Sequence, residues 1–563
     1  MLDKLRTHLA HADALPTLAV LGLCSGLLAG GVIVLFRILI DSLQMSFLPG
    51  GDVENYEGLS AFWRFSLPAL GGLFIGLLFQ LAGGAQVGVI HVLERLAYFQ
   101  GHLPLRNMLL QFVGAAMSIV SGHSVGREGP SVHLGAACGS LLGQGLQLPN
   151  NSIQILLACG AAAAIAASFN TPIAGVIFAM EVILMEYTIA GFAPVILAAV
   201  TATAVSRAAF GAAPAFIVPP MDMVSLLELP YMLVMGIAIG ALAAVFIGQL
   251  QRVTLFGTHF PIWQRMTLAG IFVGLCGLFV PAVMGIGYDT VNAAMLGELG
   301  LGFLLLVMVF KVLATTVGLG LGLPGGLIGP TLVIGACAGG ALGIAAEYLF
   351  PGQVASPGFY AMLGMGAMMS ATLQAPLAAL MALLELTYNP HIILPGMLVV
   401  VVSDIIASHV FGRDSVFLTL LRARGLDYRS NPVAQALRRV GVASVMDTSL
   451  ATTTRTLSHS AAESLLIDEP LHVLVLEDRQ PVSLLLAADL ARHLTARPDQ
   501  AEVDLLEIPA QRDDIRPIGM QATLQQALDE MDEHKVDALY VIRGGDIIGT
   551  LSRQSVEAHY RQP

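Results

Sequence analysis

The sequence predicts an all-α polytopic membrane protein followed by a small α/β domain. Hydrophobic residues make up 56% of the 563 residues and charged residues only 12%, about half the roughly 25% that soluble domains carry. The acidic charge is concentrated at the end of the chain. Residues 441–563 contain 20 acidic and 10 basic side chains, a net charge of −10 out of −12 for the whole protein.

The membrane part is indicated by a series of apolar segments. The candidates are 17–40, 65–82, 108–122, 153–168, 172–185, 189–206, 230–249, 267–283, 303–319, 331–345 and 391–411. Several are shorter than the ~20 residues that span hydrocarbon, and many are interrupted by some of the 60 glycines or 28 prolines. Broken helices persist in a membrane only where protein buries them or where they line a cavity. The pattern therefore favours a transporter or channel over a simple anchor.

The chain changes character near residue 425. We predict a transmembrane domain over 1–425 with two halves of about 15–210 and 228–420, a basic linker over 426–440 and a soluble domain over 441–563. Positive charge flanking a membrane segment marks the cytoplasmic side. The residues that place the tail and the N-terminus there are Arg422, Arg424, Arg429, Arg438, Arg439, Lys4 and Arg6.

Two stretches of the membrane part repeat each other without a gap. Residues 126–143 (GREGPSVHLGAACGSLLG) match 326–343 (GLIGPTLVIGACAGGALG) in their glycine and proline positions. A second pair, FNTPIAGVIFAMEV and LQAPLAALMALLEL, follows in the same order and aligns Glu181 with Glu385. Duplicated membrane halves commonly form inverted repeats with the substrate site between them near the midplane. We therefore expect the two stretches to meet.

Each repeated GxxGP stretch opens a helix. Proline suits the first helical turn, where its missing N–H had no partner. The free N–H groups and the positive end of the helix dipole attract an anion, so two such ends hold one without a lysine. The expected backbone ligands are Gly126, Arg127, Gly129, Leu327, Ile328 and Gly329.

GREGP with its repeat partner, FNTPIAG, the apolar body and the tail resemble the CLC family of chloride channels and chloride/proton exchangers. The resemblance covers nearly the whole chain. It implies an inverted-repeat fold of about eighteen helices per subunit and a homodimer with one pore in each subunit. The partners it implies are chloride ions, the lipid membrane and a second copy, with no nucleic acid, metal or required cofactor. The expected location is the inner (plasma) membrane of a bacterium, with both termini cytoplasmic.

Glu128 matches the gating glutamate of this family. A carboxylate at a helix N-terminus is a tethered anion that competes with a free one, and ionisable groups within membrane segments are functional by default. The alternative is a structural pair with Arg127, which we interpret as a scaffold. His123 and His133 flank the gate, and we expect them to be packing residues or helix-end hydrogen-bond partners, although either is able to titrate near neutral pH.

The sequence departs from the family pattern at the inner pore. GGAQVG (83–88) stands where the resemblance implies Gly-Ser-Gly-Ile-Pro, so Ala85 replaces the serine and the amide of Gln86 is a candidate substitute. Phe417 occupies the position of a tyrosine. In the second motif Leu327 and Ile328 lie where the family carries a phenylalanine. Backbone coordination survives these changes, whereas two anion-binding hydroxyls are lost.

Val182 occupies the position where proton-coupled members carry a second glutamate and channels carry valine. Glu186 is an alternative proton donor, and we interpret Glu181 and Glu385 as structural. We therefore predict a chloride-selective channel gated by Glu128. The alternatives are a chloride/proton antiporter and a carrier of another anion such as fluoride, nitrate or bicarbonate. No nucleophile–base pair or metal-ligand motif points to an enzyme.

The tail predicts two β-β-α units. The expected elements are strands 473–477 and 483–487 with helix 488–496, then helix 523–534, strands 538–542 and 546–552, and helix 553–560. VASVMD and IGTLSRQSV resemble parts of a CBS-domain pair, which implies either an adenine-nucleotide site or a structural dimerisation or regulatory module. Ser555 stands where the nucleotide site has an aspartate. In the first unit Asp489 fills that position, but Leu486 replaces the threonine before it.

Overall fold

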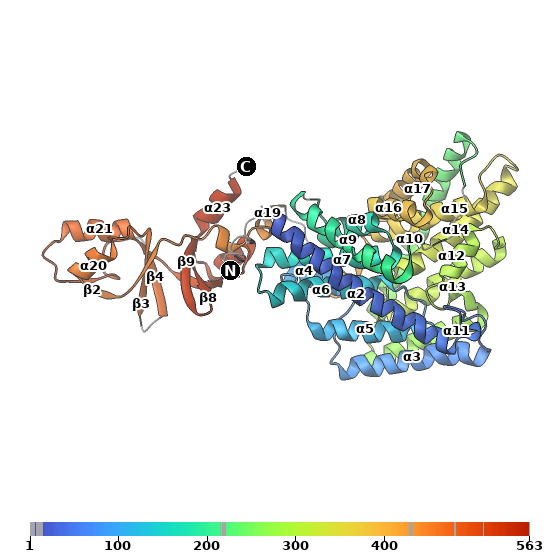
Figure 1. The fold of residues 1–563 in the computed structure, drawn as a ribbon, viewed down its shortest axis with the longest axis horizontal. Helices are drawn as coiled ribbons and strands as arrows, with labels where there is room; N and C mark the ends of the chain where they lie inside the picture. Colours follow the sequence, from blue (N-terminus) through green and yellow to red (C-terminus); the bar gives the residue numbers. More distant parts are fainter. Residues whose placement is uncertain are drawn as a thin grey trace. The chain divides into compact units, whose positions relative to one another are not determined.

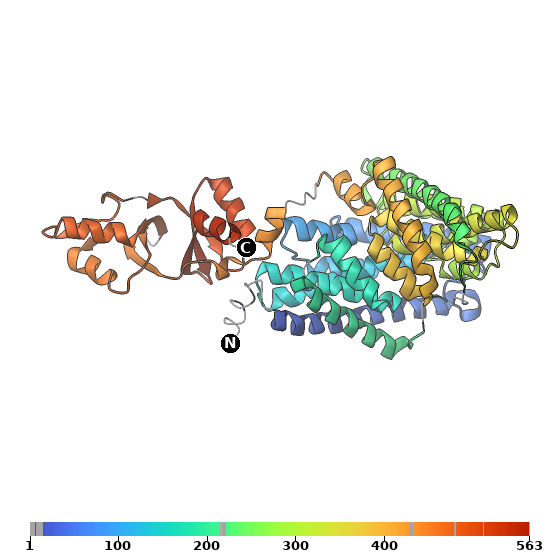
Figure 2. The ribbon, with the colours of Figure 1, turned by 90° about the horizontal axis from the view of Figure 1, so that it is seen from above.

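The computed structural model describes Arg6, Leu9, Phe216 and residues 15–187, 189–213, 221–426, 432–477, 480–510 and 512–561. The predictions at Lys4 and Arg429 lie outside the described residues. The chain divides into two compact units, one of residues 15–144 and 153–428 and the other of residues 1–14, 145–152 and 429–563. The first unit is a bundle of helices and the second contains the strands (Figures 1 and 2).

The helical unit is built from two halves. The first contains α2 (Leu15–Phe47), η1 (Pro49–Gly51), α3 (Ala61–Leu81), α4 (Val89–Tyr98), α5 (Leu105–Val120), α6 (Glu128–Gly145), α7 (Asn150–Phe169), α8 (Pro172–Phe178), η2 (Ala179–Leu184) and α9 (Ile189–Phe210). The second contains η3 (Leu226–Glu228), α10 (Leu229–Gly257), α11 (Ile262–Phe279), η4 (Pro281–Val283), α12 (Tyr288–Met295), α13 (Leu301–Gly320), α14 (Ile328–Leu349), α15 (Pro357–Leu373), α16 (Pro376–Thr387), η5 (Pro390–Ile392), α17 (Ile393–Ile405), η6 (Ile406–Val410) and α18 (Val416–Ala423).

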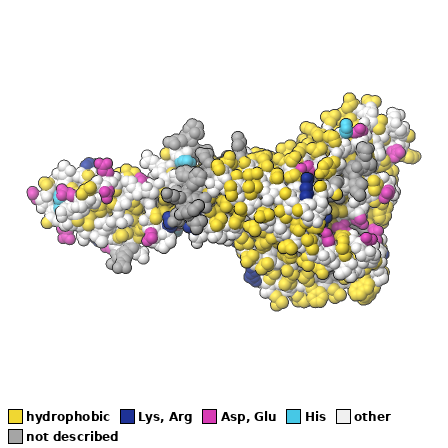
Figure 3. All heavy atoms as spheres, in the orientation of Figure 1, with side chains coloured by type: hydrophobic (Ala, Val, Ile, Leu, Met, Phe, Trp, Pro, Cys, Tyr) yellow, Lys and Arg dark blue, Asp and Glu magenta, His cyan; other side chains and the backbone are white. Residues whose placement is uncertain are grey.

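The helical unit has the surface of a membrane protein. Among the described residues, nine helices are long and apolar enough to cross a membrane. Large apolar side chains such as Leu27, Leu35 and Phe74 are more than half exposed, and hydrophobic side chains cover the visible face of these helices (Figure 3). Water does not favour such a continuous apolar surface, whereas lipid does. The chain is an integral membrane protein.

Glycines repeat the same helix contact in both halves. A Cβ on Gly135 of α6 would lie 2.2 Å from the carbonyl oxygen of Gly160 on α7, and a Cβ on Gly335 of α14 would lie 2.4 Å from that of Gly364 on α15. Only glycine permits backbones to approach this closely. The predicted duplication is therefore present in the packing as well as in the sequence.

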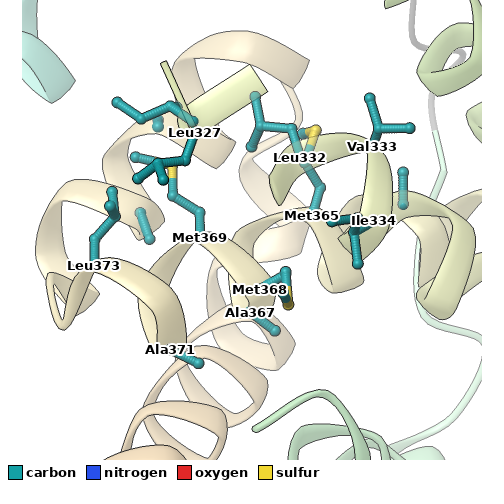
Figure 4. Close-up of a cluster of buried hydrophobic side chains, with 14 of the residues drawn as sticks. Leu327, Leu332, Val333, Ile334, Met365, Ala367, Met368, Met369, Ala371 and Leu373 are labelled. Carbon is teal, nitrogen blue, oxygen red and sulfur yellow. The ribbon is translucent and has the colours of Figure 1, made fainter. Parts of the chain in front are cut away.

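Helix α15 was missing from the predicted membrane segments. Its sequence, PGFYAMLGMGAMMSATL, is rich in glycine and methionine, and all its residues from Gly358 to Leu373 are buried. Figure 4 shows Met365, Met368 and Met369 beside residues of α14 such as Leu332. Methionine is flexible enough to fill irregular gaps in a core, so this helix belongs to the protein interior.

The second unit confirms the two β-β-α units of the tail. In the first, β1 (Leu450–Thr454) pairs in parallel with β3 (His472–Glu477), which pairs antiparallel with β4 (Gln480–Leu486). In the second, β7 (Ile515–Gly519), β8 (Ala538–Arg543) and β9 (Asp546–Ser552) repeat this pattern. The remaining elements are α19 (Pro432–Arg438), η7 (Val442–Ser444), β2 (Thr456–Ser458), α20 (His459–Leu465), α21 (Ala487–Ala496), β5 (Glu502–Asp504), β6 (Arg512–Asp513), α22 (Leu524–His534) and α23 (Arg553–Arg561).

Candidate functional site: an anion pathway closed by a glutamate

The two GxxGP motifs meet, as the sequence predicts. Gly126 and Gly326 exchange two backbone hydrogen bonds, each with an N···O distance of 2.7 Å. A Cβ on Gly129 would lie 2.7 Å from the Cα of Gly326, so a side chain there would push the motifs apart. Helix α6 begins at Glu128 and α14 begins at Ile328. Two helix N-termini are therefore joined at one point, where unpaired N–H groups favour an anion.

The side chain of Glu128 supplies that anion. It is completely buried. Its Oε2 accepts a hydrogen bond of 3.2 Å from the backbone N–H of Gly329, and its Oε1 accepts one from the hydroxyl of Tyr288. The carboxylate thus binds in the first turn of α14, where the sequence predicts a free anion to bind. Glu128 therefore occupies a backbone N–H that the sequence assigns to the expected anion site.

Arg127 lies beside the gate without forming a close ion pair. Its Nε is 4.0 Å from Glu128 Oε1, and its guanidinium lies over the ring of Tyr288, 5.5 Å from the ring centroid. A cation over an aromatic face is attracted by the ring quadrupole. These contacts agree with the interpretation of Arg127 as a scaffold, since it orients the tyrosine that holds Glu128.

A second carboxylate supports Tyr288 from the loop between α2 and α3. Glu54 Oε2 accepts hydrogen bonds from the N–H groups of Gly287 (3.3 Å) and Tyr288 (3.2 Å), at the N-terminus of α12. Burial and the nearby charge of Asp289 raise the pKa of Glu54 to about 7. Lys311 is also buried here, and its Nζ donates to two backbone carbonyls. Glu54, Tyr288 and Glu128 therefore form a chain of contacts that contains two carboxylates.

The predicted inner-pore residues Ala85, Gln86 and Phe417 line one cavity of about 310 Å³, hereafter the vestibule. Gly129 and residues 325–328 also line it, so the vestibule reaches the two motifs. Its other lining residues include Phe79, Gln111, Leu323, Pro324, Arg265 and Arg424. The two arginines make this space attractive to an anion.

Gln86 lies at the exposed side of the vestibule. Its side-chain oxygen accepts a hydrogen bond from Arg424, and its backbone carbonyl accepts one from Asn107 Nδ2 at 2.8 Å. The arginine therefore fixes the Gln86 side chain through its oxygen. Phe417 is buried, and its ring has no hydrogen-bonding group to offer.

Glu181 and Glu385 each cap the N-terminus of a helix in the opposite half of the protein. Glu385 accepts hydrogen bonds from the N–H groups of Ile173 and Ala174 at the start of α8. Glu181 accepts from Leu377 and Ala378 at the start of α16. Carboxylates at helix N-termini satisfy free N–H groups and the helix dipole, which agrees with a structural role.

Val182 is buried in the apolar core, with 3% of its surface exposed. It lies in the π-helical turn η2. Glu186 follows this helix, and its N–H donates to the carbonyl of Met180 at 3.0 Å. The position at which the resemblance implies a proton-accepting glutamate in exchangers is therefore a buried side chain that cannot titrate.

The two predicted histidines have different partners. His123 Nδ1 lies 2.8 Å from Ser121 Oγ and 3.0 Å from the carbonyl oxygen of Ser118, which agrees with a helix-end role. His133 Nε2 lies 2.9 Å from Nδ1 of His91 on α4. Both members of this second pair are buried.

The sequence motifs did not identify Tyr288, Glu54 or Gln111. Tyr288 and Glu54 lie outside both repeated stretches, and no pattern marks them. Gln111 had a usable signal, because it is a polar residue within the apolar segment 108–122, and such residues in membrane helices are commonly functional.

In the tail, the first unit keeps Asp489 buried, where Arg492 contacts its carboxylate. In the second unit the hydroxyls of Ser552 and Ser555 lie 2.8 Å apart. Asp489 and Ser555 are the two positions at which the CBS resemblance implies a nucleotide-binding aspartate. The nucleotide expectation stays a prediction.

Comparison with known proteins places this geometry in a family. Residues 71–408 match the family model "Voltage gated chloride channel", and residues 508–559 match the CBS domain. The chain is 36% identical over 423 residues to a putative chloride channel protein ClcB-like of Ralstonia nicotianae, covering 73% of this chain and 97% of that protein. It is 32% identical to the H(+)/Cl(-) exchange transporter ClcA of Vibrio cholerae, covering 56% of this chain and 69% of that protein.

Solved structures agree. A slow cyanobacterial Cl-/H+ antiporter matches with a TM-score of 0.63 and 25% identity, over 72% of this chain and 97% of that one. A eukaryotic CLC transporter matches with a TM-score of 0.60 and 19% identity, over 96% of this chain and 97% of that one, and supports the fold. The motif match, the relatives and the inverted-repeat fold together show that this chain is a member of the CLC family of anion transport proteins and carries a CBS domain near its C-terminus.

Proposed function

We propose that this protein exchanges chloride for protons across the membrane, with Glu128 as the group that both species use. The observation that carries the proposal is the bond from Gly329 N–H to Glu128 Oε2. An ionised carboxylate in this position excludes a free anion. When it takes up a proton it loses its charge and its charge-assisted bonds, and an anion then binds the freed N–H of Gly329.

The relatives support exchange over the channel function expected from the sequence. Those from Vibrio cholerae and Yersinia pestis carry the name H(+)/Cl(-) exchange transporter, and the structure at 25% identity is a Cl-/H+ antiporter. Because Val182 does not titrate, the proton reaches Glu128 by a route that does not use this position. We further propose that the protein functions as a homodimer in the plasma membrane of a bacterium, with its termini in the cytoplasm.

A chloride channel is the second candidate, and Val182 is the observation that favours it. The buried valine removes the simplest proton acceptor, and the relative at 36% identity is named a putative chloride channel protein. In this case Glu128 gates passive flow and proton movement is not tied to chloride movement.

A flux assay in liposomes tests the proposal. Vesicles loaded with concentrated potassium chloride are diluted into low chloride, and valinomycin makes the membrane permeable to potassium. Exchange predicts that chloride efflux is accompanied by proton uptake in a fixed ratio. Chloride efflux with no proton movement supports the channel instead. Empty vesicles give the background for both fluxes.

A further inference from the structure

The vestibule contains a buried amide to which neither the resemblance nor the comparisons assign a role. Gln111 on α5 is 1% exposed and lines the vestibule. Within the described part of the chain, neither its Nε2 nor its Oε1 has a hydrogen-bond partner. An unpaired amide is unfavourable in a buried position. Its retention therefore points to a ligand that enters the vestibule.

The residue at the matching position of the other half, Lys311, differs from Gln111 in its hydrogen bonding. Gln111 and Lys311 each lie fifteen residues before the first glycine of their motif. Lys311 donates hydrogen bonds to the carbonyls of Val283 and Gly285. Gln111 has no such bonds. One half thus uses this position to hold backbone, and the other places a buried, unpaired amide at the wall of a cavity.

The surroundings of Gln111 fit an anion. The vestibule has lost the hydroxyls at Ala85 and Phe417, and the amide of Gln86 is fixed at the exposed side by Arg424. The N–H₂ group of a carboxamide donates two hydrogen bonds. The vestibule is also lined by Gly129 and residues 325–328, and the next residue, Gly329, donates the N–H that holds Glu128. An anion at Gln111 would lie on the approach to that site.

We propose that the Nε2 group of Gln111 binds the transported anion in the vestibule, in place of the two missing hydroxyls. The inference rests on the proposed transport of anions through this cavity, and it does not depend on whether that transport is coupled to protons. Arg265 and Arg424 concentrate anions at the vestibule, and Gln111 supplies the directed donor. No covalent step is involved.

The test is chloride binding by the purified full-length protein in detergent, measured by calorimetry and by the rise of the melting temperature with sodium chloride. Gln111→Met keeps the size of the side chain and removes the donor. Hydrogen bonds to charged groups predict roughly tenfold to hundredfold weaker chloride binding. The matched control is Ser118→Ala, since Ser118 is on the same helix, fully buried and likewise unpaired, yet does not line the vestibule.

Equal chloride affinity in Gln111→Met and the unaltered protein overturns the inference, as does equal weakening by Ser118→Ala. If Gln111→Met does not fold, Gln111→Glu keeps the shape and places a carboxyl in the vestibule. Its chloride binding at pH 8 is expected to be lost, and retained binding overturns the inference. The proton-to-chloride ratio of Gln111→Met separates this inference from the proposed function. Weaker chloride binding with an unchanged proton-to-chloride ratio supports both the role of Gln111 and the exchange function. Normal chloride binding without any proton coupling contradicts both.

Discussion

The hydroxyl of Tyr288 donates a hydrogen bond to the carboxylate of Glu128, and this bond joins α12 to the point where the two repeated motifs meet. Tyr288 is itself held by Arg127 over its ring and by Glu54 at its backbone N–H. The gate is therefore a group of contacts and not a single side chain. Two of these contacts lead to separate predictions.

Tyr288→Phe removes the hydroxyl and keeps the ring. Hydrogen bonds to charged groups are worth about 1.5–3 kcal/mol, so Glu128 will occupy the anion position less firmly. We expect chloride to compete better, with transport at low chloride rising by about tenfold or more. Chloride efflux from liposomes at several chloride concentrations measures this. Tyr231→Phe is the control, because its hydroxyl bonds the carbonyl of Leu342 away from the gate. Equal changes in the two variants would exclude the proposed role of Tyr288.

Glu54 gives the protein a pH-dependent stability. Its pKa of about 7 in the folded protein exceeds the ordinary value of 4.5. The folded state therefore binds this proton more tightly than the unfolded state. The stabilisation is present below about pH 4.5 and is lost as pH rises through about 7. Thermal unfolding between pH 5 and 8 should show a falling melting temperature that Glu54→Gln flattens.

The control for Glu54 is Asp52→Asn in the same loop, where Asp52 is exposed. This variant should keep the slope of the unaltered protein. A melting temperature that falls equally in Glu54→Gln would mean that another group titrates in this range.

Glu385→Gln tests the structural role of the paired glutamates. The amide replaces one of the two acceptor oxygens that bond Ile173 and Ala174 with an N–H₂ group, and a lost hydrogen bond to a charged group costs about 1.5–3 kcal/mol. We expect a lower melting temperature and an unchanged proton-to-chloride ratio. Glu347→Gln on the exposed end of α14 should alter neither. A changed ratio in a stable Glu385→Gln protein would instead make Glu385 part of the proton route.

The parts of the site that follow from local backbone chemistry could be predicted from the sequence. GREGP and its partner specify helix starts, and the gap-free repeat places Gly126 against Gly326. Tyr288 could not be found this way, since it contributes one hydroxyl from a loop-helix junction that lies outside both repeated stretches. Which side chain reaches Glu128 depends on the packing of α12, and a pattern of apolar residues does not determine that packing.

Most of the fold could also be predicted from local sequence patterns. The strand pattern of the tail identified its elements to within a few residues, and the apolar runs located long helices, although α2 and α10 extend seven and eight residues past the predicted ends. Helix α15 was missed because its glycines and methionines lower the apolar signal, although its position follows from the repeat, since α15 follows α14 as α7 follows α6. The duplication was therefore more informative than the hydropathy of that segment.

The most direct test of the account is the reversal potential of liposomes that contain the protein, measured under a chloride gradient with and without a pH gradient. Exchange through Glu128 predicts that the pH gradient shifts the reversal potential away from the chloride equilibrium value. Glu128→Gln should remove the shift while chloride still flows. A reversal potential that stays at the chloride equilibrium value, whatever the pH gradient, would contradict exchange and establish a channel.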